Sequence, residues 1–344
     1  MRTALFLLGL ALLLVGMLLW MAGGLQSPRR FEGDVVKLSE PGPVSTSTLT
    51  VVVWNIAWGY GRGSEGSGDS KPPSHFEATL ARMADVLTQS RADIALLQEV
   101  DFDSQRSGGI DQARRLAELA GFPFIAPAVS WRANYVPFPY WPPSNHFGRV
   151  ISGGAILSRL PIETNDITLL PKPDDNLVVY NWFYLFRYHQ RVRVRWSGAP
   201  IVVYNAHLEA FDGTNRQAQA RAWVEVLNRE SGDLTLVGGD FNAIPPESMT
   251  RSNFADMPKI SYETDRTVPL IRGAKGLRDT VPSEAFLERP SAYFTYPAHD
   301  PNRKLDHLMV TGDFRVISAR VMQEAGGVSD HLPLLVRLGP RKTN

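Results

Sequence analysis

The sequence has 344 residues, of which 44% are hydrophobic and 21% are charged, and its formal net charge is +1. This length suits one large domain or two ordinary ones, and the composition is typical of a globular protein. The absence of cysteine excludes disulfides, thiolate nucleophiles and cysteine-based zinc sites, and the nearly balanced charge gives no strong electrostatic case for a nucleic-acid binder.

The N-terminal segment, residues 1–25, differs from the rest of the chain. Its run "ALFLLGLALLLVGMLLWMA" at residues 4–22 carries no charge and is long enough to span a bilayer as a helix. We predict a membrane anchor. The alternatives are a signal segment cleaved near Ala22 and Gly24 and a buried soluble helix. Because long domains translocate largely regardless of flanking charge, we expect the folded domain outside the cytoplasm, either anchored or, after cleavage, secreted or periplasmic.

A linker and three helices are predicted next. Residues 26–47 are rich in Pro, Gly and Ser and favour a linker, which leaves residues 48–340 for the folded domain. Apolar spacing predicts helices over residues 75–90, 111–121 and 218–228. Capping boxes are expected at Ser74 with Glu77 and at Thr214 with Gln217, and a helix end at Gly121.

Nine apolar segments predict strands. Some are separated by the helices and others follow one another directly, which favours mixed sheets with helices outside. Two such sheets packed face to face would bury the segments that are apolar on both sides. The predicted strands cover residues 49–54, 93–98, 153–158, 191–196, 200–208, 234–239, 304–310, 314–322 and 333–338.

Polar residues recur where the predicted strands begin or end. Sheet proteins gather reactive groups from distant parts of the chain at such places, so these residues predict a site, although a polar turn would explain any single case. His307 follows Asp306 on a strand and should point away from the site, so we assign it a structural role. The residues are Asn55, Glu99, His207, Asp240, Asn242, Asp306, Asp330 and His331.

The residue types restrict the chemistry. Carboxylates such as Glu99 are hard oxygen ligands that suit Mg²⁺ or Mn²⁺. Histidine could suggest zinc, but Asp, Asn and Glu are in excess. The sequence has no Gly-x-Ser-x-Gly, no HExxH and no Walker-type loop. Hydrolysis of a phosphate ester by metal-assisted water fits best.

Seven short motifs carry a resemblance to a known family. "WN", "LLQEV", "GGAILSRLPI", "NAHL", "GGDFN", "LDH" and "SDHLP" occur in this order, and together they resemble the endonuclease/exonuclease/phosphatase superfamily over nearly all of residues 48–338. The resemblance implies an α/β fold, a four-layer α/β/β/α sandwich of two mixed sheets, here with an N-terminal hydrophobic helix. It also implies a metal-dependent phosphoric ester hydrolase.

The resemblance assigns metal-binding roles to three residues. Glu99 would be the principal ligand of Mg²⁺ or Mn²⁺, with Asn55 beside it. Asp330 would support the metal or the neighbouring His331. The structural alternatives are a strand cap at Asn55 and an exposed carboxylate at Glu99.

The resemblance assigns catalytic roles to five residues. Asp240 would orient or deprotonate the attacking water, and Asn242 would hold the water or a phosphate oxygen. His331 would stabilise charge on the phosphate or help the leaving group, and Asp306 would orient His331. His207 would contact the phosphate; its alternative is a hydrogen-bonded core histidine.

Two aromatic stretches, residues 130–154 and 180–190, bear on the substrate. They predict an apolar rim that meets lipid or a bulky organic group, with Trp141 and His146 as substrate-binding residues; two packed surface loops are the alternative. Stacking on nucleic-acid bases is possible in principle, but Lys and Arg do not cluster here.

We expect a monomeric phosphodiesterase or phosphatase on a lipid or small organic phosphate. The alternatives are an endonuclease or exonuclease on DNA or RNA and a non-catalytic binding module.

Overall fold

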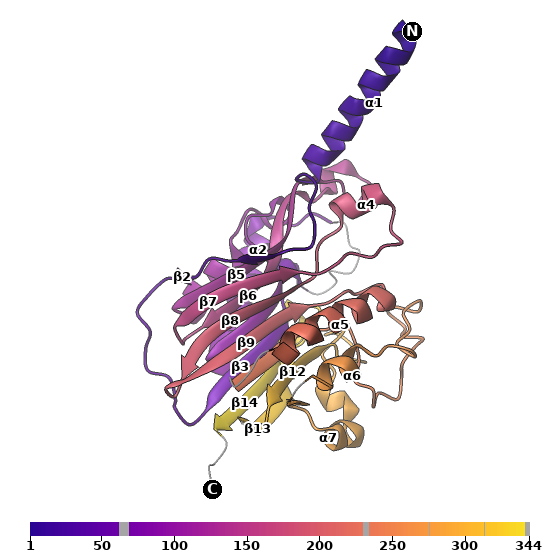
Figure 1. The fold of residues 1–344 in the computed structure, drawn as a ribbon. Coiled ribbons are helices and arrows are strands. Elements are labelled where there is room, and N and C mark those ends of the chain that lie inside the picture. The colour runs from indigo at the N-terminus through magenta and orange to yellow at the C-terminus, as the bar shows by residue number, and fades with distance from the viewer. Residues whose placement is uncertain (62–68, 230–233, 275, 313, 341–344) are drawn as a thin grey trace.

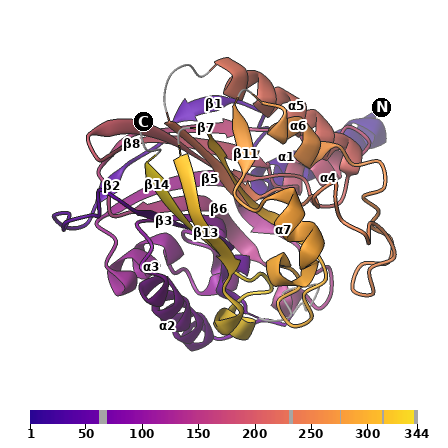
Figure 2. The same ribbon diagram turned by 90° about the horizontal axis from the view of Figure 1, so that it is seen from below.

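The computed structural model describes residues 1–61, 69–229, 234–274, 276–312 and 314–340. In this part of the chain, two seven-stranded sheets pack face to face and helices cover both outer faces (Figures 1 and 2). This arrangement confirms the predicted α/β/β/α sandwich, including the apolar helix at the N-terminus.

Both sheets are mixed. The pairs β9/β10 and β3/β4 are parallel and the other neighbouring strands are antiparallel. In spatial order, the first sheet contains β1 (Arg30–Glu32), β7 (Ile162–Leu169), β8 (Tyr188–Trp196), β9 (Ala199–His207), β10 (Leu234–Asp240), β12 (Asp306–Thr311) and β11 (Leu277–Asp279). The second contains β13 (Phe314–Val321), β14 (Leu334–Pro340), β3 (Leu49–Asn55), β4 (Ile94–Asp101), β6 (Gly148–Ser158), β5 (Phe124–Val136) and β2 (Val36–Lys37).

The helices cover the sheets on opposite sides. Apolar side chains of α2 and α3 pack on the second sheet, and those of α5 and α6 pack on the first. The α-helices are α1 (Arg2–Met21), α2 (Pro73–Ser90), α3 (Gln112–Ala120), α4 (Val178–Phe183), α5 (Gly213–Arg229), α6 (Thr267–Arg272) and α7 (Ser283–Glu288).

The core between the sheets explains the strands that are apolar on both faces. Val51 and Leu96 of the second sheet, with Val203 and Leu236 of the first, are fully buried in one cluster. The other face of each strand meets a helix layer. Each fully buried side chain of this size stabilises the fold by roughly 1.5–3 kcal/mol.

Both predicted capping boxes are wrong. Helix α2 begins at Pro73, so Ser74 and Glu77 lie inside it, and Glu77 pairs with Arg115 instead. Proline fits the first turn because its missing N–H is not needed there.

Helix α5 is capped by a residue just before the predicted box. Asp212 accepts hydrogen bonds from the backbone N–H groups of Thr214 and Asn215. Asp212 therefore has the capping role that was predicted for Thr214. By contrast, helix α3 ends at Ala120, which confirms the predicted helix end at Gly121. Gly121 has the left-handed backbone conformation.

The segment predicted as a linker lies against the sandwich. Strand β1 pairs with β7, and β2 pairs with β5, at the edges of the two sheets. The sequence did not predict β5 or β7. Strand β5 carries a proline and several small side chains, so its apolar and polar residues alternate only weakly. Strand β7 is largely polar, with four polar residues in succession after its first isoleucine.

Helix α1 stands out from the sandwich (Figure 1). Within the described residues, it is the one helix long and apolar enough to cross a membrane, and almost all of it is exposed. Its inner end is fixed to β5, because the Asn134 side-chain amide donates to the carbonyl of Trp20 at 2.8 Å and Gln26 donates to the carbonyl of Arg132 at 2.9 Å.

Candidate active site

Three polar side chains lie in a row across the ends of neighbouring strands of the first sheet. Asp240, the last residue of β10, is opposite Asp306 of β12 and beside His207 of β9. The strand register alone therefore brings together three residues that are far apart in the sequence.

The glycine pair before Asp240 makes this close approach possible. A Cβ atom on Gly239, whose φ is 144°, would lie 1.9 Å from the carbonyl oxygen of Ala206. A Cβ on Gly238 would lie 2.8 Å from side chains of Leu96 and Leu308. Glycine is required at position 239 because a side chain there would clash with the backbone of β9, whereas a side chain at position 238 would displace the ends of Leu308 and of Leu96 in the facing sheet.

The second sheet contributes Asn55 and Glu99. Glu99 lies at an irregularity of β4, between Gln98 and Val100, and has a φ of 52°. Such a bulge changes the direction of a side chain, and strained backbone of this kind is concentrated at functional sites.

The amide of Asn55 joins the two sheets. Its Nδ2 donates to Glu99 Oε1 at 3.1 Å and to Asp240 Oδ2 at 3.0 Å, while its Oδ1 accepts from the backbone N–H of Ala57. In this orientation Asn55 offers N–H groups to the carboxylates. The metal-binding role predicted for Asn55 would use its Oδ1, which here accepts from Ala57.

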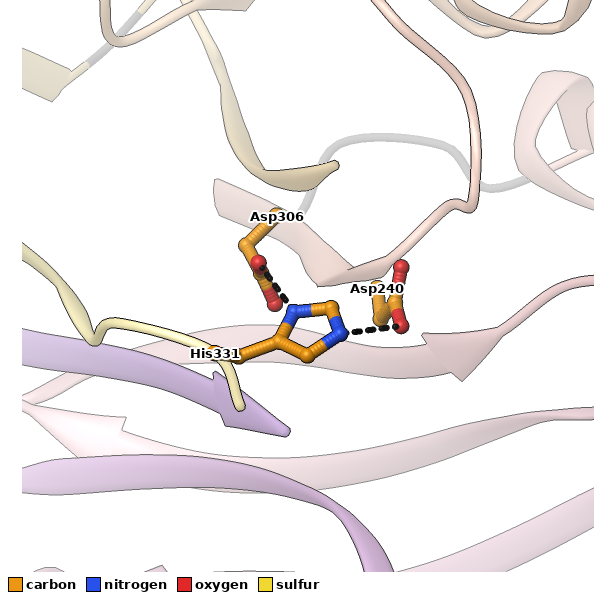
Figure 3. A group of neighbouring side chains, drawn as sticks. All are labelled: Asp240, Asp306 and His331. Carbon is orange, nitrogen blue, oxygen red and sulfur yellow. Dashed lines mark hydrogen bonds and ion pairs between the residues drawn. The ribbon is translucent and has the colours of Figure 1, made fainter. Parts of the chain in front are cut away.

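His331 lies between two carboxylates (Figure 3). Its Nδ1 donates to Asp306 Oδ2 at 2.8 Å, and its Nε2 is 3.7 Å from Asp240 Oδ2. Burial opposes the charge on the imidazole, but the two carboxylates outweigh burial and raise the pKa of His331 to about 10. The two carboxylates therefore favour the imidazolium form of His331.

Asp240 has both carboxylate oxygens engaged. Oδ2 receives Asn55, and Oδ1 accepts from the backbone N–H of Asn242 at 2.9 Å. Burial raises the pKa of Asp240 to about 6, against the opposing effect of His331. Asn242 has a φ of 48° and donates its amide to the carbonyl of Leu208.

His207 is neutral and has a cationic neighbour. Arg187 Nη1 donates to His207 Nε2 at 2.7 Å. Burial, followed by the charge of Arg187, lowers the pKa of His207 well below its usual value. Arg187 also lies 3.7 Å from Glu209, which accepts from the Tyr184 hydroxyl.

The donor set fits a divalent cation better near Glu99 than near His331. The loss of solvent around Glu99, and the charge of Asp330, raise the pKa of Glu99. A cation between these carboxylates would offset their repulsion, and carboxylates are the preferred ligands of Mg²⁺. Single ligand atoms of Asp240, Asp306 and His331 also lie within 4.8 Å of one another, but His331 Nδ1 and Asp306 are already bound to each other at 2.8 Å.

Most of these residues line one cavity of about 960 Å³. Glu99, Asp240, Asn242, Asp330 and His331 line its inner end, together with His207 and Arg187. Asp306 lies behind His331 and is fully buried.

The two residues expected to bind substrate are not among the described residues that line the cavity. His146 Nδ1 is bound to the hydroxyl of Tyr135, which holds its ring against β5. Trp141 is 80% exposed. Neighbouring aromatic residues of the same loop, Phe138 and Tyr140, line the cavity instead.

Sequence reasoning missed Arg187 and Glu209. The available signal was position: Arg187 directly precedes β8, and Tyr188 is opposite His207 in the register. A cation at that point of the sheet falls next to the site. Glu209 follows the His207 strand end by two residues.

A four-layer sandwich with carboxylates and imidazoles at its strand ends defines a class of hydrolases that act on phosphate esters. The sequence matches the endonuclease/exonuclease/phosphatase family over residues 52–331, and this protein belongs to that family. Among curated proteins, none matches the sequence.

Solved structures share the fold at low sequence identity. An endonuclease/exonuclease/phosphatase from Beutenbergia cavernae is 22% identical with a TM-score of 0.62, over 86% of this chain and 72% of that chain. Mannosyl-6-phosphatase from Bacteroides thetaiotaomicron is 16% identical with a TM-score of 0.54, over 84% and 99%. TDP2 from Caenorhabditis elegans is 17% identical with a TM-score of 0.50, over 85% and 74%. These similarities establish the shared fold.

Proposed function

We propose that this protein is a divalent-metal-dependent hydrolase of phosphate esters, a phosphodiesterase or phosphatase acting on a lipid or small organic phosphate. The observation that carries the proposal is the arrangement of Asp240 between Asn55 and the His331 imidazolium, with Glu99 beside it. This arrangement supports the proposal because it would combine a base, a cation and a ligand set for hard metals in one site.

Glu99 and Asp330 would hold Mg²⁺ or Mn²⁺, with Asn55 orienting Glu99. The metal would supply positive charge to the phosphate and lower the pKa of water. Asp240, largely ionised above pH 6, takes a proton from the water that attacks phosphorus. The ester P–O bond breaks as the new P–O bond forms.

The leaving alcohol takes its proton from His331. Asp306 holds Nδ1 of the imidazolium, so that the proton on Nε2 points to the cavity. Asn242 would hold a phosphate oxygen or the water. His207, bound by Arg187, would contact the phosphate from the opposite side of Asp240.

The nuclease alternative has less support. Arg106 and Arg187 are the Arg or Lys residues among the described cavity lining, and each faces a carboxylate, Asp101 and Glu209 respectively. A nucleic-acid groove needs cations available to backbone phosphates.

We also propose that residues 1–25 anchor the protein, as a monomer, in a membrane, with the catalytic domain outside the cytoplasm. Alkaline carbonate extraction of the full-length chain tests the anchor. Retention in the membrane pellet is expected, and release into the supernatant would contradict it.

The test of function is hydrolysis of sphingomyelin, inositol phosphates and plasmid DNA by the full-length protein with Mg²⁺, Mn²⁺ or EDTA. Activity on a non-nucleic substrate should vanish in EDTA and return with either metal. Glu99→Gln should weaken Mn²⁺ binding measured by calorimetry, whereas Glu163→Gln, a change at an exposed ion pair, should not. Full activity in EDTA would contradict the metal requirement, and activity on DNA alone would favour the nuclease.

A further inference from the structure

The cavity extends from the catalytic residues to the N-terminal helix. Leu18, in the last turn of α1, lines the same cavity as Asp240 and His331. The bonds from Asn134 and Gln26 fix this end of α1 on β5. A helix that spans a bilayer therefore has its inner end at the outer opening of the active-site cavity.

The outer wall of the cavity is apolar and exposed. Helix α4 lies beside the inner end of α1 in both views (Figures 1 and 2). Leu177, just before α4, is 81% exposed, and Phe211, after β9, is 65% exposed. Phe138, Val179 and Tyr180 continue this wall. A contiguous group of exposed apolar side chains usually marks a contact with a partner or a membrane.

The charged residues of the cavity are all at its inner part or already engaged. Arg106 binds Asp101 through two hydrogen bonds and lies over the rings of Trp58, Trp131 and Phe147. Among the described lining residues, the wall towards Leu18 thus has room for a hydrocarbon and presents no free cation for a second phosphate.

Resting on the proposed function, we propose that the cavity binds an amphiphilic phosphate ester drawn from the bilayer that α1 spans. The phosphate lies at Asp240 and His331, and the hydrocarbon part extends along Val179 and Tyr180 towards Leu18. The bilayer supplies the ligand because the helix that crosses it ends at the opening of the cavity.

The test uses monoalkyl phosphates as probes, with the full-length protein held in amphipol. Butyl, hexyl, octyl and decyl phosphate share one headgroup and differ in hydrocarbon length. Binding is measured as the rise in apparent Tm followed by tryptophan fluorescence, which needs no turnover. Affinity should increase by about threefold to fourfold per buried methylene.

A matched pair of variants separates the cavity from the surface. Val179 lines the cavity and its neighbour Val178 does not, although both are exposed on α4. Val179→Asp should abolish the dependence on chain length, and Val178→Asp should keep it. Partition of the probes into amphipol is the same for both variants and therefore cancels.

A second arm tests the source of the ligand. The wild type is reconstituted in phosphatidylcholine vesicles with or without a minor fraction of dioleoyl phosphatidic acid. Its apparent Tm should be higher when phosphatidic acid is present, and the apparent Tm of Val179→Asp should not change. Affinity independent of chain length, or equal gains in both variants, would overturn the inference. A response to alkyl phosphates without a response in vesicles would overturn the membrane source. Failure to hydrolyse any phosphate ester, with these shifts present, would instead contradict the proposed function.

Discussion

Two buried histidine clusters lie on opposite faces of strand β12. Asp306 points towards the candidate site and binds His331 from behind, whereas the next residue, His307, points to the other face of the strand. In the second cluster Lys304 Nζ donates to His307 Nδ1 at 2.7 Å, and His307 Nε2 donates to the carbonyl of Ala243. Both clusters combine imidazole with carboxylate, since Asp279 lies 3.7 Å from His307.

The neighbours shift the pKa values of the two imidazoles in opposite directions. Two carboxylates raise the pKa of His331, whereas burial and then the Lys304 ammonium lower the pKa of His307. His331 also opens to the cavity, and His307 is fully enclosed. Residue type alone therefore does not distinguish a reactive histidine from a structural one; the nearest charges and access to solvent do.

The largest expected difference between the clusters is in turnover. His331→Ala should reduce kcat by ~10² to 10⁴-fold, as for other acid–base or electrostatic groups, with unchanged circular dichroism. His307→Ala should mainly reduce stability and leave kcat per folded molecule almost unchanged. Comparable losses of kcat in the two variants would remove the distinction.

The second expected effect is on stability. Lys304→Met removes the buried ammonium 4.0 Å from Asp279, which keeps Arg272 as a partner at 3.2 Å, and should lower the free energy of unfolding by about 1–3 kcal/mol, measured by urea denaturation. Lys37→Met removes an exposed pair with Glu40 and should cost at most about 1 kcal/mol. Similar costs would mean that the buried network does not depend on its cation.

A double-mutant cycle then tests the first cluster as a unit. Asp306→Ala should reduce kcat in the wild type but have little further effect on His331→Ala, because residues acting together are non-additive. The measurement is kcat for both single variants and the double variant on one phosphodiester. Strictly multiplicative losses would show that the two residues act independently.

The smallest expected effect is a pH dependence of the second cluster. Burial opposes the charge of Asp279, but Lys304, His307 and Arg272 outweigh burial and lower its pKa below the usual 3.8. The ionised form therefore stabilises the fold above about pH 4, and this stabilisation is lost as the pH falls further, at up to ~1.4 kcal/mol per pH unit. Asp279→Asn should have a flatter stability profile in acid. An identical profile would contradict the assignment.

The sequence predicted the residues whose positions depend on strand register. Asp240, Asp306 and His207 adjoin because hydrogen-bonded strands align them, and apolar runs already marked those strands. The structural role expected for His307 also followed from strand alternation, and its contacts agree with that expectation.

Residues placed by loops could not be predicted in the same way. Arg187 enters the site because the chain between β7 and β8 returns over the cavity, and no local pattern encodes that path. The residue type of Trp141 suggested substrate contact, but in the folded loop Phe138 and Tyr140 line the cavity and Trp141 does not. The attachment of α1 to β5 depends on two side-chain amides that have no sequence signature.

The Asn55 amide, bound to one carboxylate from each sheet, makes the site sensitive to how the two halves of the sandwich are aligned. Sliding of one sheet over the other would change the distance between Glu99 and Asp240 and break one of the two bonds. Inter-sheet residues such as Leu96 and Leu236 therefore set catalytic geometry as well as stability. A cavity-forming substitution there would impair turnover before the protein unfolds.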